Sequence, residues 1–345
     1  MTRRACLLAA ASAALRTGDA RAQESAPAIL DASRVPWVGA AGRAAYAEFV
    51  RSNLPRAFAV SEDGRHGWAG GATAAEARTA ALAACAAKAP GGNAPPCVVY
   101  ADGLDIVLAG RDWRAPPPPP LIGTWNYAFV PDPRFLWHGP STAAGVYVWA
   151  HGKGGGDSRS IQPQPHVRLF NNAGWDIVRF DRDPVADDVD RATGWLHDGL
   201  VELRRRGWAR IAAGGQSRGG WNCLRMLDTP GTADLLVAIS PAAHGNGGSV
   251  FSGDQDDDLR RIVVNAGPSR TRMVFAQFGG DAFIGDPDAR VAQISRLRPR
   301  LGGLLIIDRP GGFVGHTAGT GPAFASAFGP CILEFAMSPN PGSAC

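Results

Sequence analysis

Residues 210–227 read RIAAGGQSRGGWNCLRML, and this stretch decides the fold class of the chain. It opens with the apolar, strand-like segment Arg210–Ala213 and closes with the apolar, helix-like segment Trp221–Leu227. Between them, Gly215–Gly219 (GQSRG) matches the pattern G-x-S-x-G, with Ser217 at its centre. A sharp turn from strand to helix lifts a serine hydroxyl clear of a sheet, and flanking glycines leave room for the strained backbone. We therefore predict that Ser217 is a nucleophile. A glycine-rich turn with a capping serine is the alternative, because the chain has 44 glycines.

Apolar strand-like and helix-like segments alternate on both sides of this motif. Such alternation is typical of a mostly parallel sheet covered by helices on both faces, so we expect an α/β fold. The expected strands are Gly145–Ala150, Asp176–Phe180, Arg210–Ala213, Leu235–Ile239, Arg272–Phe278 and Leu304–Ile307. The expected helices are Val167–Asn172, Arg191–Arg206, Trp221–Leu227, Leu259–Val264, Asp288–Arg298 and Ala323–Met337.

A serine nucleophile needs a histidine base, and the base needs an acid to orient it. On a strand-turn-helix motif of this kind the acid and then the histidine follow the serine along the chain. Only His244 and His316 follow Ser217. His316 comes after the last apolar strand and before the last helix, where the base is expected. His244 precedes the expected acid, so we interpret it as a loop residue or a pocket-lining residue.

Three aspartates are candidates for the acid. Asp281 directly follows the strand Arg272–Phe278, and a carboxylate at the end of that strand would reach the neighbouring loop that carries His316. Asp286 is the runner-up, although with Pro287 it could equally begin the next helix. Asp308, after the next strand, is the third candidate.

A glycine-rich loop, residues 151–156 (HGKGGG), follows the strand that ends at Ala150. Bare backbone N–H groups in such a loop can stabilise the oxyanion that forms during acyl transfer. The candidate donors there are Gly152, Lys153 and Gly154, with the N–H of Arg218 as their partner. A phosphate-binding loop is the rival interpretation, but the pattern G-x-x-x-x-G-K-[ST] is absent.

From Ile122 to the last helix the chain resembles the α/β-hydrolase superfamily, particularly its dienelactone-hydrolase-like and esterase-like members. The resemblance implies a triad of Ser217, Asp281 and His316 and a carboxylic ester hydrolase that works through an acyl-enzyme on a small acyl ester. Lys153 departs from the His-Gly-Gly-Gly loop of the hormone-sensitive-lipase branch, which is therefore not indicated. A serine peptidase on the same fold is the alternative activity. A catalytically inactive binding protein on a hydrolase scaffold is the alternative of another class.

The first residues are typical of a cleavable signal peptide, residues 1–22. Arg3 and Arg4 precede the apolar run Cys6–Leu15, and Ala20-Arg21-Ala22 gives a small-x-small cleavage site. We expect a periplasmic or secreted protein. The apolar run is too short to span a bilayer, and no later stretch is apolar enough, so we expect no stable membrane insertion.

The proline run Pro116–Pro120 favours a stiff, extended linker and divides the rest of the chain. We expect a small α+β domain over residues 23–113, a linker over 114–120 and a catalytic domain over 121–345. The small domain resembles small secreted modules with a strand, turn, helix and strand and a helix-to-strand disulfide; its protein partner is not identified by the sequence. The expected elements are a strand at Arg56–Ser61, a turn at Gly64–Gly71 that holds His66 and Trp68, a helix at Ala74–Ala87 with Thr73 as its cap, and a strand at Cys97–Tyr100.

Five cysteines follow the expected signal peptide. Their spacing favours the disulfides Cys85–Cys97 and Cys331–Cys345, and leaves Cys223 as a buried free thiol. The chain has no CxxC and no His/Cys cluster, so we expect neither a metal nor another cofactor. The alternating Asp254, Asp256 and Asp258 lack the glycine and the closing glutamate of a calcium loop, and we interpret them as an acidic helix start. The net charge of +4 comes without any block of basic residues, so nucleic acid is not an expected partner.

Overall fold

The structure is a computed structural model that describes residues 27–89, 91, 93–108, 116–153, 161–243 and 252–345. The expected signal peptide, the candidate donor Gly154 and His244 lie outside these residues. Within them the chain forms two sheets, one of four strands and one of eight.

The four-stranded sheet belongs to the small N-terminal domain and has the order β2-β1-β3-β4. Its neighbouring strands are all antiparallel. Helix α2 begins with a capping box, in which the Thr73 side chain accepts a hydrogen bond from the N–H of Glu76 and the Glu76 side chain bonds back, as the sequence predicted. The elements are α1 (Ala40–Arg51), β1 (Arg56–Val60), β2 (His66–Gly70), α2 (Ala74–Ala86), β3 (Val98–Asp102) and β4 (Asp105–Ile106), preceded by 3₁₀ turns at Ala28–Leu30 and Ala32–Arg34.

The prediction of a turn over Gly64–Gly71 is wrong for most of its length, because His66–Gly70 is strand β2. His66 and Trp68 therefore lie on an edge strand paired with β1. Gly67 explains the difference: a Cβ at this position would lie 2.5 Å from the backbone nitrogen of Cys85, so the glycine lets helix α2 pack closely on the strand.

Helix α1 was not predicted from the sequence. Its buried face consists of Gly42, Tyr46 and Phe49, which recur at the spacing of one helix face. Only two of these are large apolar side chains, so the periodic signal in this alanine- and arginine-rich segment is weak. Tyr46 and Phe49 pack with Phe58 into the core of the small domain.

The eight-stranded sheet has the order β5-β6-β8-β7-β9-β10-β11-β12. Strand β6 is antiparallel to both of its neighbours, and the other adjacent pairs are parallel. Counted along this sheet alone, the second strand is antiparallel and the third and fourth exchange places, which is the topology of the α/β-hydrolase fold. The predicted fold class is confirmed.

The elements of the large domain follow the predicted alternation. The strands are β5 (Ile122–Gly123), β6 (Tyr127–Pro131), β7 (Gly145–Ala150), β8 (Trp175–Arg182), β9 (Ile211–Gln216), β10 (Leu235–Ile239), β11 (Arg272–Gln277) and β12 (Gly303–Asp308). The helices are α3 (Pro165–Asn172), α4 (Val189–Arg205), α5 (Arg218–Arg225), α6 (Ser252–Asn265), α7 (Pro287–Ser295) and α8 (Pro322–Met337), with short 3₁₀ turns at Met226–Asp228, Arg298–Arg300 and Ala318–Thr320.

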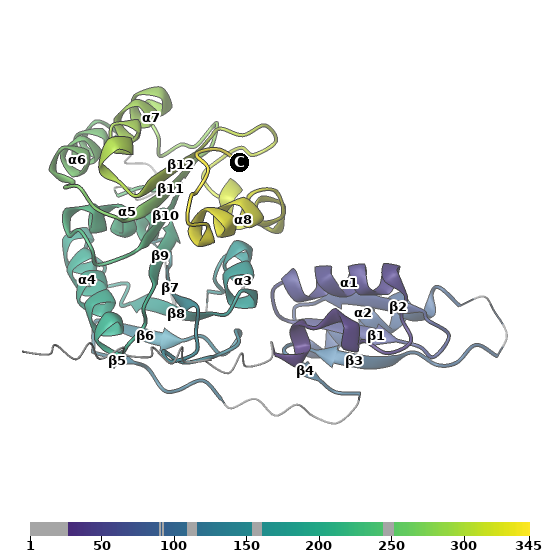
Figure 1. Cartoon of the computed structure of the whole chain (residues 1–345). Coiled ribbons are helices and arrows are strands. Elements are labelled where there is room, and N and C mark those ends of the chain that lie inside the picture. Colours follow the sequence, from purple (N-terminus) through teal and green to yellow (C-terminus); the bar gives the residue numbers. More distant parts are fainter. Residues whose placement is uncertain (1–26, 90, 92, 109–115, 154–160, 244–251) are drawn as a thin grey trace, which may run out of the picture.

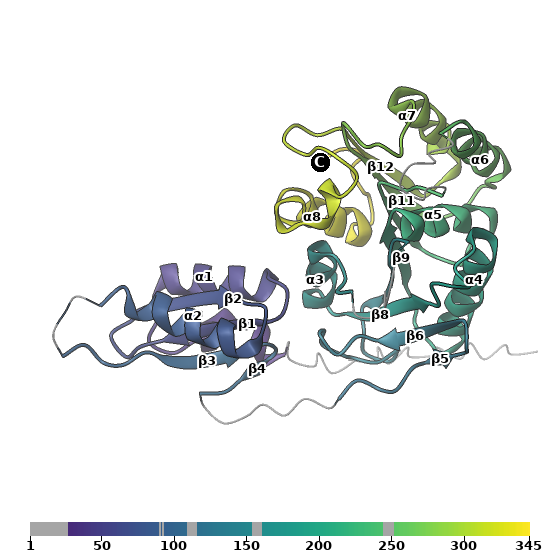
Figure 2. The same ribbon diagram turned by 180° about the vertical axis from the view of Figure 1, so that it is seen from behind.

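Two apolar cores lie on opposite faces of this sheet. Helices α4, α5, α6 and α7 cover one face, and α3 and α8 cover the other (Figures 1 and 2). Strand β7 serves both cores, since Val146 and Val148 point to the first and Tyr147 and Trp149 to the second. Burial on both faces explains why the parallel strands read as continuous apolar runs in the sequence.

The small domain lies beside α3 (Figure 1). The side chain of Asn172, at the end of α3, donates to the carbonyl of Val50 in α1 at 2.8 Å, and Asn53 donates to the carbonyl of Pro163 at 3.2 Å. Leu136, from the large domain, joins the apolar core of the small one. The two parts are therefore packed together through side chains of both.

Both expected disulfides are present in the structure. Cys85 bonds Cys97 and ties α2 to the start of β3, while Cys331 bonds Cys345 and ties α8 to the C-terminal segment. Cys223 is a buried free thiol on α5, and burial raises its pKa to about 12.

Candidate active site

The predicted site residues share one edge of the sheet. Strands β7, β9, β11 and β12 run in the same direction, so the loops that follow them meet at their carboxyl ends. These loops carry Gly152, Ser217, Asp281 and His316 respectively. The fold thus gathers residues that are up to 164 positions apart (316 − 152) in the sequence.

Ser217 occupies the sharp turn between β9 and α5. Strand β9 ends at Gln216 and α5 begins at Arg218, so the serine alone connects them, and its φ of 55° and ψ of −123° lie in a region that non-glycine residues rarely occupy. The strand is longer and the helix begins earlier than predicted. A Cβ at Gly215 or at Gly219 would overlap the carbonyl oxygen of Ala150, so both glycines of the motif are required by backbone packing.

His316 and Asp281 form a close pair. The Nδ1 of His316 lies 2.9 Å from Oδ2 and 3.0 Å from Oδ1 of Asp281, whose side chain is fully buried. The N–H of Gly315 donates to the carbonyl of Gly279 at 2.8 Å, which extends the pairing of β11 and β12 beyond the strands and brings the two loops together. The backbone pairing of the two loops therefore places His316 next to Asp281.

The structure separates the three candidate acids. Asp281 accepts a further hydrogen bond from the N–H of Phe283 at 2.9 Å, which fixes its carboxylate toward His316. Asp286 caps α7 by accepting from the N–H of Ala289. Asp308 accepts from the side chain of Gln277 and pairs with Arg309. Asp286 thus caps a helix and Asp308 pairs with an arginine. Of the three candidates, Asp281 is the one whose carboxylate bonds His316.

The second nitrogen of His316, Nε2, is buried and has no hydrogen-bond partner. Because Nδ1 bonds a carboxylate, Nδ1 carries the proton in the neutral ring and Nε2 presents its lone pair. The ring of Phe283 packs on the imidazole, with 4.3 Å between centroids. No hydrogen bond joins Ser217 Oγ to Nε2; in sites without substrate this bond is often long and shortens when substrate binds.

The predicted oxyanion loop passes next to the serine. A Cβ on Gly152 would lie 3.4 Å from the Cβ of Ser217, so the backbone of Gly152 approaches Ser217 closely. The side chain of Lys153 is exposed, and Gly154 is outside the described residues. Arg218 is the first residue of α5, where backbone N–H groups have no partner within the helix.

Gln216 is a site residue that the sequence analysis missed. Its side-chain amide donates to the carbonyl of His316 at 3.0 Å, and its Oε1 lies 3.1 Å from the position of a Cβ on Gly152. Gln216 therefore spans the space between the oxyanion loop and the histidine loop. It occupies a variable position of the G-x-S-x-G pattern, and nothing in the sequence marks it.

A polar hollow of about 640 Å³ begins beside this site, next to Lys153 and Arg218, and extends between α4 and α6. Aspartates line it, and Asp190 and Asp228 both pair with Arg225.

In the described part of the chain, no group of three or more His, Cys, Asp or Glu side chains is placed to hold a metal ion. No helix among the described residues is both long and apolar enough to cross a membrane.

No family model matches the chain, and no curated protein matches it in sequence. Among solved structures it is similar to an esterase from Pyrococcus furiosus (13% identity, 60% of this chain and 86% of that one, TM-score 0.41). It is also similar to Est1E from Butyrivibrio proteoclasticus (12% identity, 63% and 96%, TM-score 0.44). An acylaminoacyl peptidase from Pyrococcus horikoshii is similar as well (10% identity, 70% and 46%, TM-score 0.45). The strand order of the large sheet is that of the α/β-hydrolase fold.

Proposed function

We propose that this protein is a serine hydrolase that cleaves carboxylic esters through an acyl-enzyme. One observation carries the proposal: the buried Asp281–His316 pair presents an unpartnered Nε2 at the edge of the sheet where Ser217 sits in a strained turn. An imidazole whose Nδ1 bonds a carboxylate and whose Nε2 is unpartnered is placed to accept a proton at Nε2. A turn with a merely capping serine would need neither the strain nor the histidine pair.

The first half of the reaction acylates the serine. Ser217 Oγ attacks the ester carbonyl carbon while Nε2 of His316 takes the hydroxyl proton, and Asp281 stabilises the imidazolium through Nδ1–H. The carbonyl oxygen becomes an oxyanion and accepts hydrogen bonds from the N–H of Arg218 and from the oxyanion loop at Gly152 and Lys153. His316 then gives its proton to the departing alcohol, and the acyl-enzyme remains.

Water completes the second half with the same residues. His316 takes a proton from water as the water oxygen attacks the acyl carbon, and then gives that proton to Ser217 Oγ as the bond to the serine breaks and the carboxylic acid is released. The site surroundings favour an ester with an apolar acyl or alcohol group. Phe283 packs on His316, and Val314, two residues before the histidine, is 74% exposed.

Export remains part of the proposal. Two disulfides in the structure are compatible with an oxidising compartment such as the periplasm or the extracellular space. We therefore propose an exported ester hydrolase whose substrate is a small-molecule ester.

The decisive experiment is labelling with a fluorophosphonate probe, followed by mass spectrometry of the modified residue. We expect modification of Ser217 and its loss in Ser217→Ala. Ser240→Ala is the matched control, because Ser240 also has a positive φ, of 41°, at the end of the neighbouring strand β10. Absence of labelling in folded wild-type protein would contradict the proposal and favour a binding role.

A panel of p-nitrophenyl esters beside a panel of peptide anilides then tests the bond that is cleaved. We expect ester turnover that falls by more than about 10³-fold in Ser217→Ala. Turnover of anilides without turnover of esters would assign a serine peptidase instead.

A further inference from the structure

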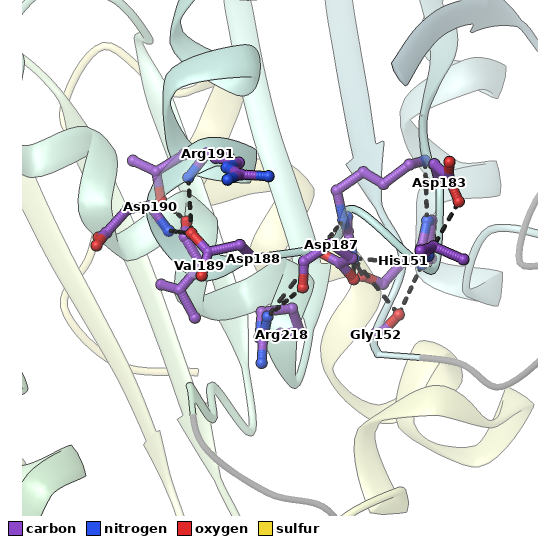
Figure 3. A network of polar contacts seen from close by, with 12 residues as sticks. His151, Gly152, Asp183, Asp187, Asp188, Val189, Asp190, Arg191 and Arg218 are labelled. Carbon is purple, nitrogen blue, oxygen red and sulfur yellow. Dashed lines mark hydrogen bonds and ion pairs between the residues drawn. The ribbon is translucent and has the colours of Figure 1, made fainter. Parts of the chain in front are cut away.

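A buried ion pair lies directly behind the oxyanion loop. Arg182 is the last residue of β8, the strand beside β7, and its side chain is fully buried. Its Nε donates to Oδ1 of Asp187 at 3.0 Å, and the carboxylate of Asp187 is only 3% exposed. Figure 3 shows Asp187 between the oxyanion loop at His151 and Gly152 on one side and Arg218 on the other. Neither Arg182 nor Asp187 lies in a motif that marks the candidate site in the sequence.

Arg182 holds the backbone of the oxyanion loop. Its NH2 group donates to the carbonyl of His151 at 2.7 Å and approaches the carbonyl of Gly152 at 3.5 Å. Its own backbone N–H donates to Nε2 of His151 at 3.3 Å. A charged donor of this kind makes a stronger bond than a neutral one, so the direction of the His151 carbonyl is well fixed.

His151 fixes the next carbonyl. Burial and the nearby cation of Arg182 lower the pKa of His151 to about 3, so its ring is neutral near pH 7. Since Nε2 accepts the N–H of Arg182, the ring proton is on Nδ1, which donates to the carbonyl of Gly152 at 2.6 Å. Two successive carbonyls of the loop are thus bound within this network.

The consequence concerns the N–H groups of the same peptides. In a trans peptide the N–H points opposite to the C=O, so binding the carbonyls of His151 and Gly152 turns the N–H groups of Gly152 and Lys153 away from them. Gly152 lies against Ser217. A loop that flipped these peptides would present carbonyl oxygens to the oxyanion and repel it.

Asp187 also reaches the other donor of the site. Its backbone carbonyl accepts from NH1 of Arg218 at 3.1 Å, and its carboxylate lies 3.9 Å from the same group. Arg218 supplies the second oxyanion N–H from the first turn of α5. One aspartate is therefore joined to both halves of the oxyanion site.

We propose that Arg182 and Asp187 are positioning residues that set the N–H donors of the oxyanion site in their catalytic direction. The inference rests on the proposed function and adds to it a buried ion pair without which the donors would not stay aligned. Loss of a single oxyanion donor lowers kcat by about 10²–10³-fold. The effect should appear in kcat and leave KM within about threefold, because the contact is made in the transition state.

The test uses Arg182→Lys and Asp187→Asn, with Asp181→Asn as the matched control. Asp181 is on the same strand and its carboxylate, 4% exposed, pairs with Arg179 at 2.7 Å. Kinetics are measured with a p-nitrophenyl ester and expressed per site titrated with the fluorophosphonate, so that unfolded molecules do not count. The affinity of a boronic acid that mimics the tetrahedral intermediate is measured in parallel.

We expect kcat to fall by about 10²-fold or more in both variants, boronic acid affinity to fall by a similar factor, and the control to match the wild type. Unchanged kcat and unchanged boronic acid affinity in Arg182→Lys and Asp187→Asn would overturn the inference. The proposed function would still stand in that case, because the wild type would be active. A rise in KM alone, with kcat unchanged, would overturn the inference as well. A wild type that neither reacts with the probe nor cleaves esters is the separate failure of the proposed function.

Discussion

The glycines around Ser217 show how single residues set this site. Gly215 and Gly219 lie where any side chain would overlap the carbonyl oxygen of Ala150. Their role is therefore close packing of β9 and α5 against β7, in addition to freedom of the turn. Other glycines of the chain have open space around them, and the contrast makes a direct test possible.

Gly219→Ala should destabilise the protein by about 1–3 kcal/mol, because the new methyl group forces β7 and α5 apart. Gly194→Ala is the matched change, on the exposed side of α4 with nothing within 4 Å of a new Cβ. That substitution should stabilise the protein by about 0.5–1 kcal/mol, since alanine is the better helix former. Urea unfolding of both variants measures the two effects, and equal stabilities would refute this account of the motif.

Gln216→Ala should lower kcat/KM by about fivefold. The substitution removes the hydrogen bond from the Gln216 side chain to the His316 carbonyl, and a bond of this kind contributes about 1 kcal/mol. Ester hydrolysis across a pH series is the measurement. A variant with wild-type kcat/KM would show that the Asp281 contact and the pairing of Gly315 with Gly279 suffice to place the histidine.

At the scale of elements, helix α2 illustrates how little apolar area some contacts offer. Its buried residues are Ala77, Ala81 and Cys85, and they face the alanines Ala57 and Ala59 of β1. Alanine side chains bury little apolar surface, so their contribution to stability is small. The disulfide from Cys85 to Cys97 therefore supplies a larger share of what holds this helix on its sheet.

Replacing Cys85 and Cys97 together by serine should lower the stability of the small domain by about 3 kcal/mol, the chain-entropy value for a loop of this size. Hydrogen exchange of the α2 amides is the measurement, and faster exchange is expected there while α8 keeps its protection. The same double change at Cys331 and Cys345 is the control, because that bond ties the C-terminal segment to α8. Exchange in α2 that stays at the wild-type rate would contradict the argument.

At the scale of the whole molecule, two buried histidines lie on the large sheet and on the helix layer that covers it. His151 directly follows strand β7. His166 lies on α3, and its Nε2 is 3.3 Å from the hydroxyl of Tyr147. Burial lowers the pKa of His166 to about 4 and, together with Arg182, that of His151 to about 3. Both imidazole rings are therefore neutral in the folded protein near pH 7.

Acid should therefore destabilise the fold before most carboxylates titrate. The folded pKa values lie below the unfolded value of 6.5, so the unfolded chain binds more protons in between. The stabilisation of the folded state by the two neutral histidines is fully present above about pH 6.5. It is lost as the pH falls toward their folded pKa values, and each histidine then lowers the free energy of unfolding by about 1.4 kcal/mol per pH unit. Urea unfolding between pH 7 and 4.5 measures this slope.

His166→Phe should remove about half of that slope, whatever it does to stability at pH 7. A slope in the His166 variant equal to that of the wild type would rule out this histidine as a source of the pH dependence.

The sequence by itself determined the class of the fold and the types of residue in the candidate site. Parallel strands buried on both faces must be apolar throughout, so β7, β9, β10, β11 and β12 stand out as apolar runs, and the serine motif falls between two of them. Elements that bury one face or lie at an edge give weaker signals. For that reason the sequence does not predict helix α1, and it predicts a turn where strand β2 lies.

The tertiary structure alone decided which residues meet. Asp281, Asp286 and Asp308 all follow or flank the strands β11 and β12, and only their packing shows that the first bonds His316 while the second caps a helix and the third pairs with Arg309. Arg182 and Asp187 belong to no sequence motif, because the role that we propose for them rests on contacts with a loop about 30 residues earlier in the chain. A sequence pattern records local geometry, whereas the contacts around the proposed oxyanion site are made by side chains that meet across neighbouring strands.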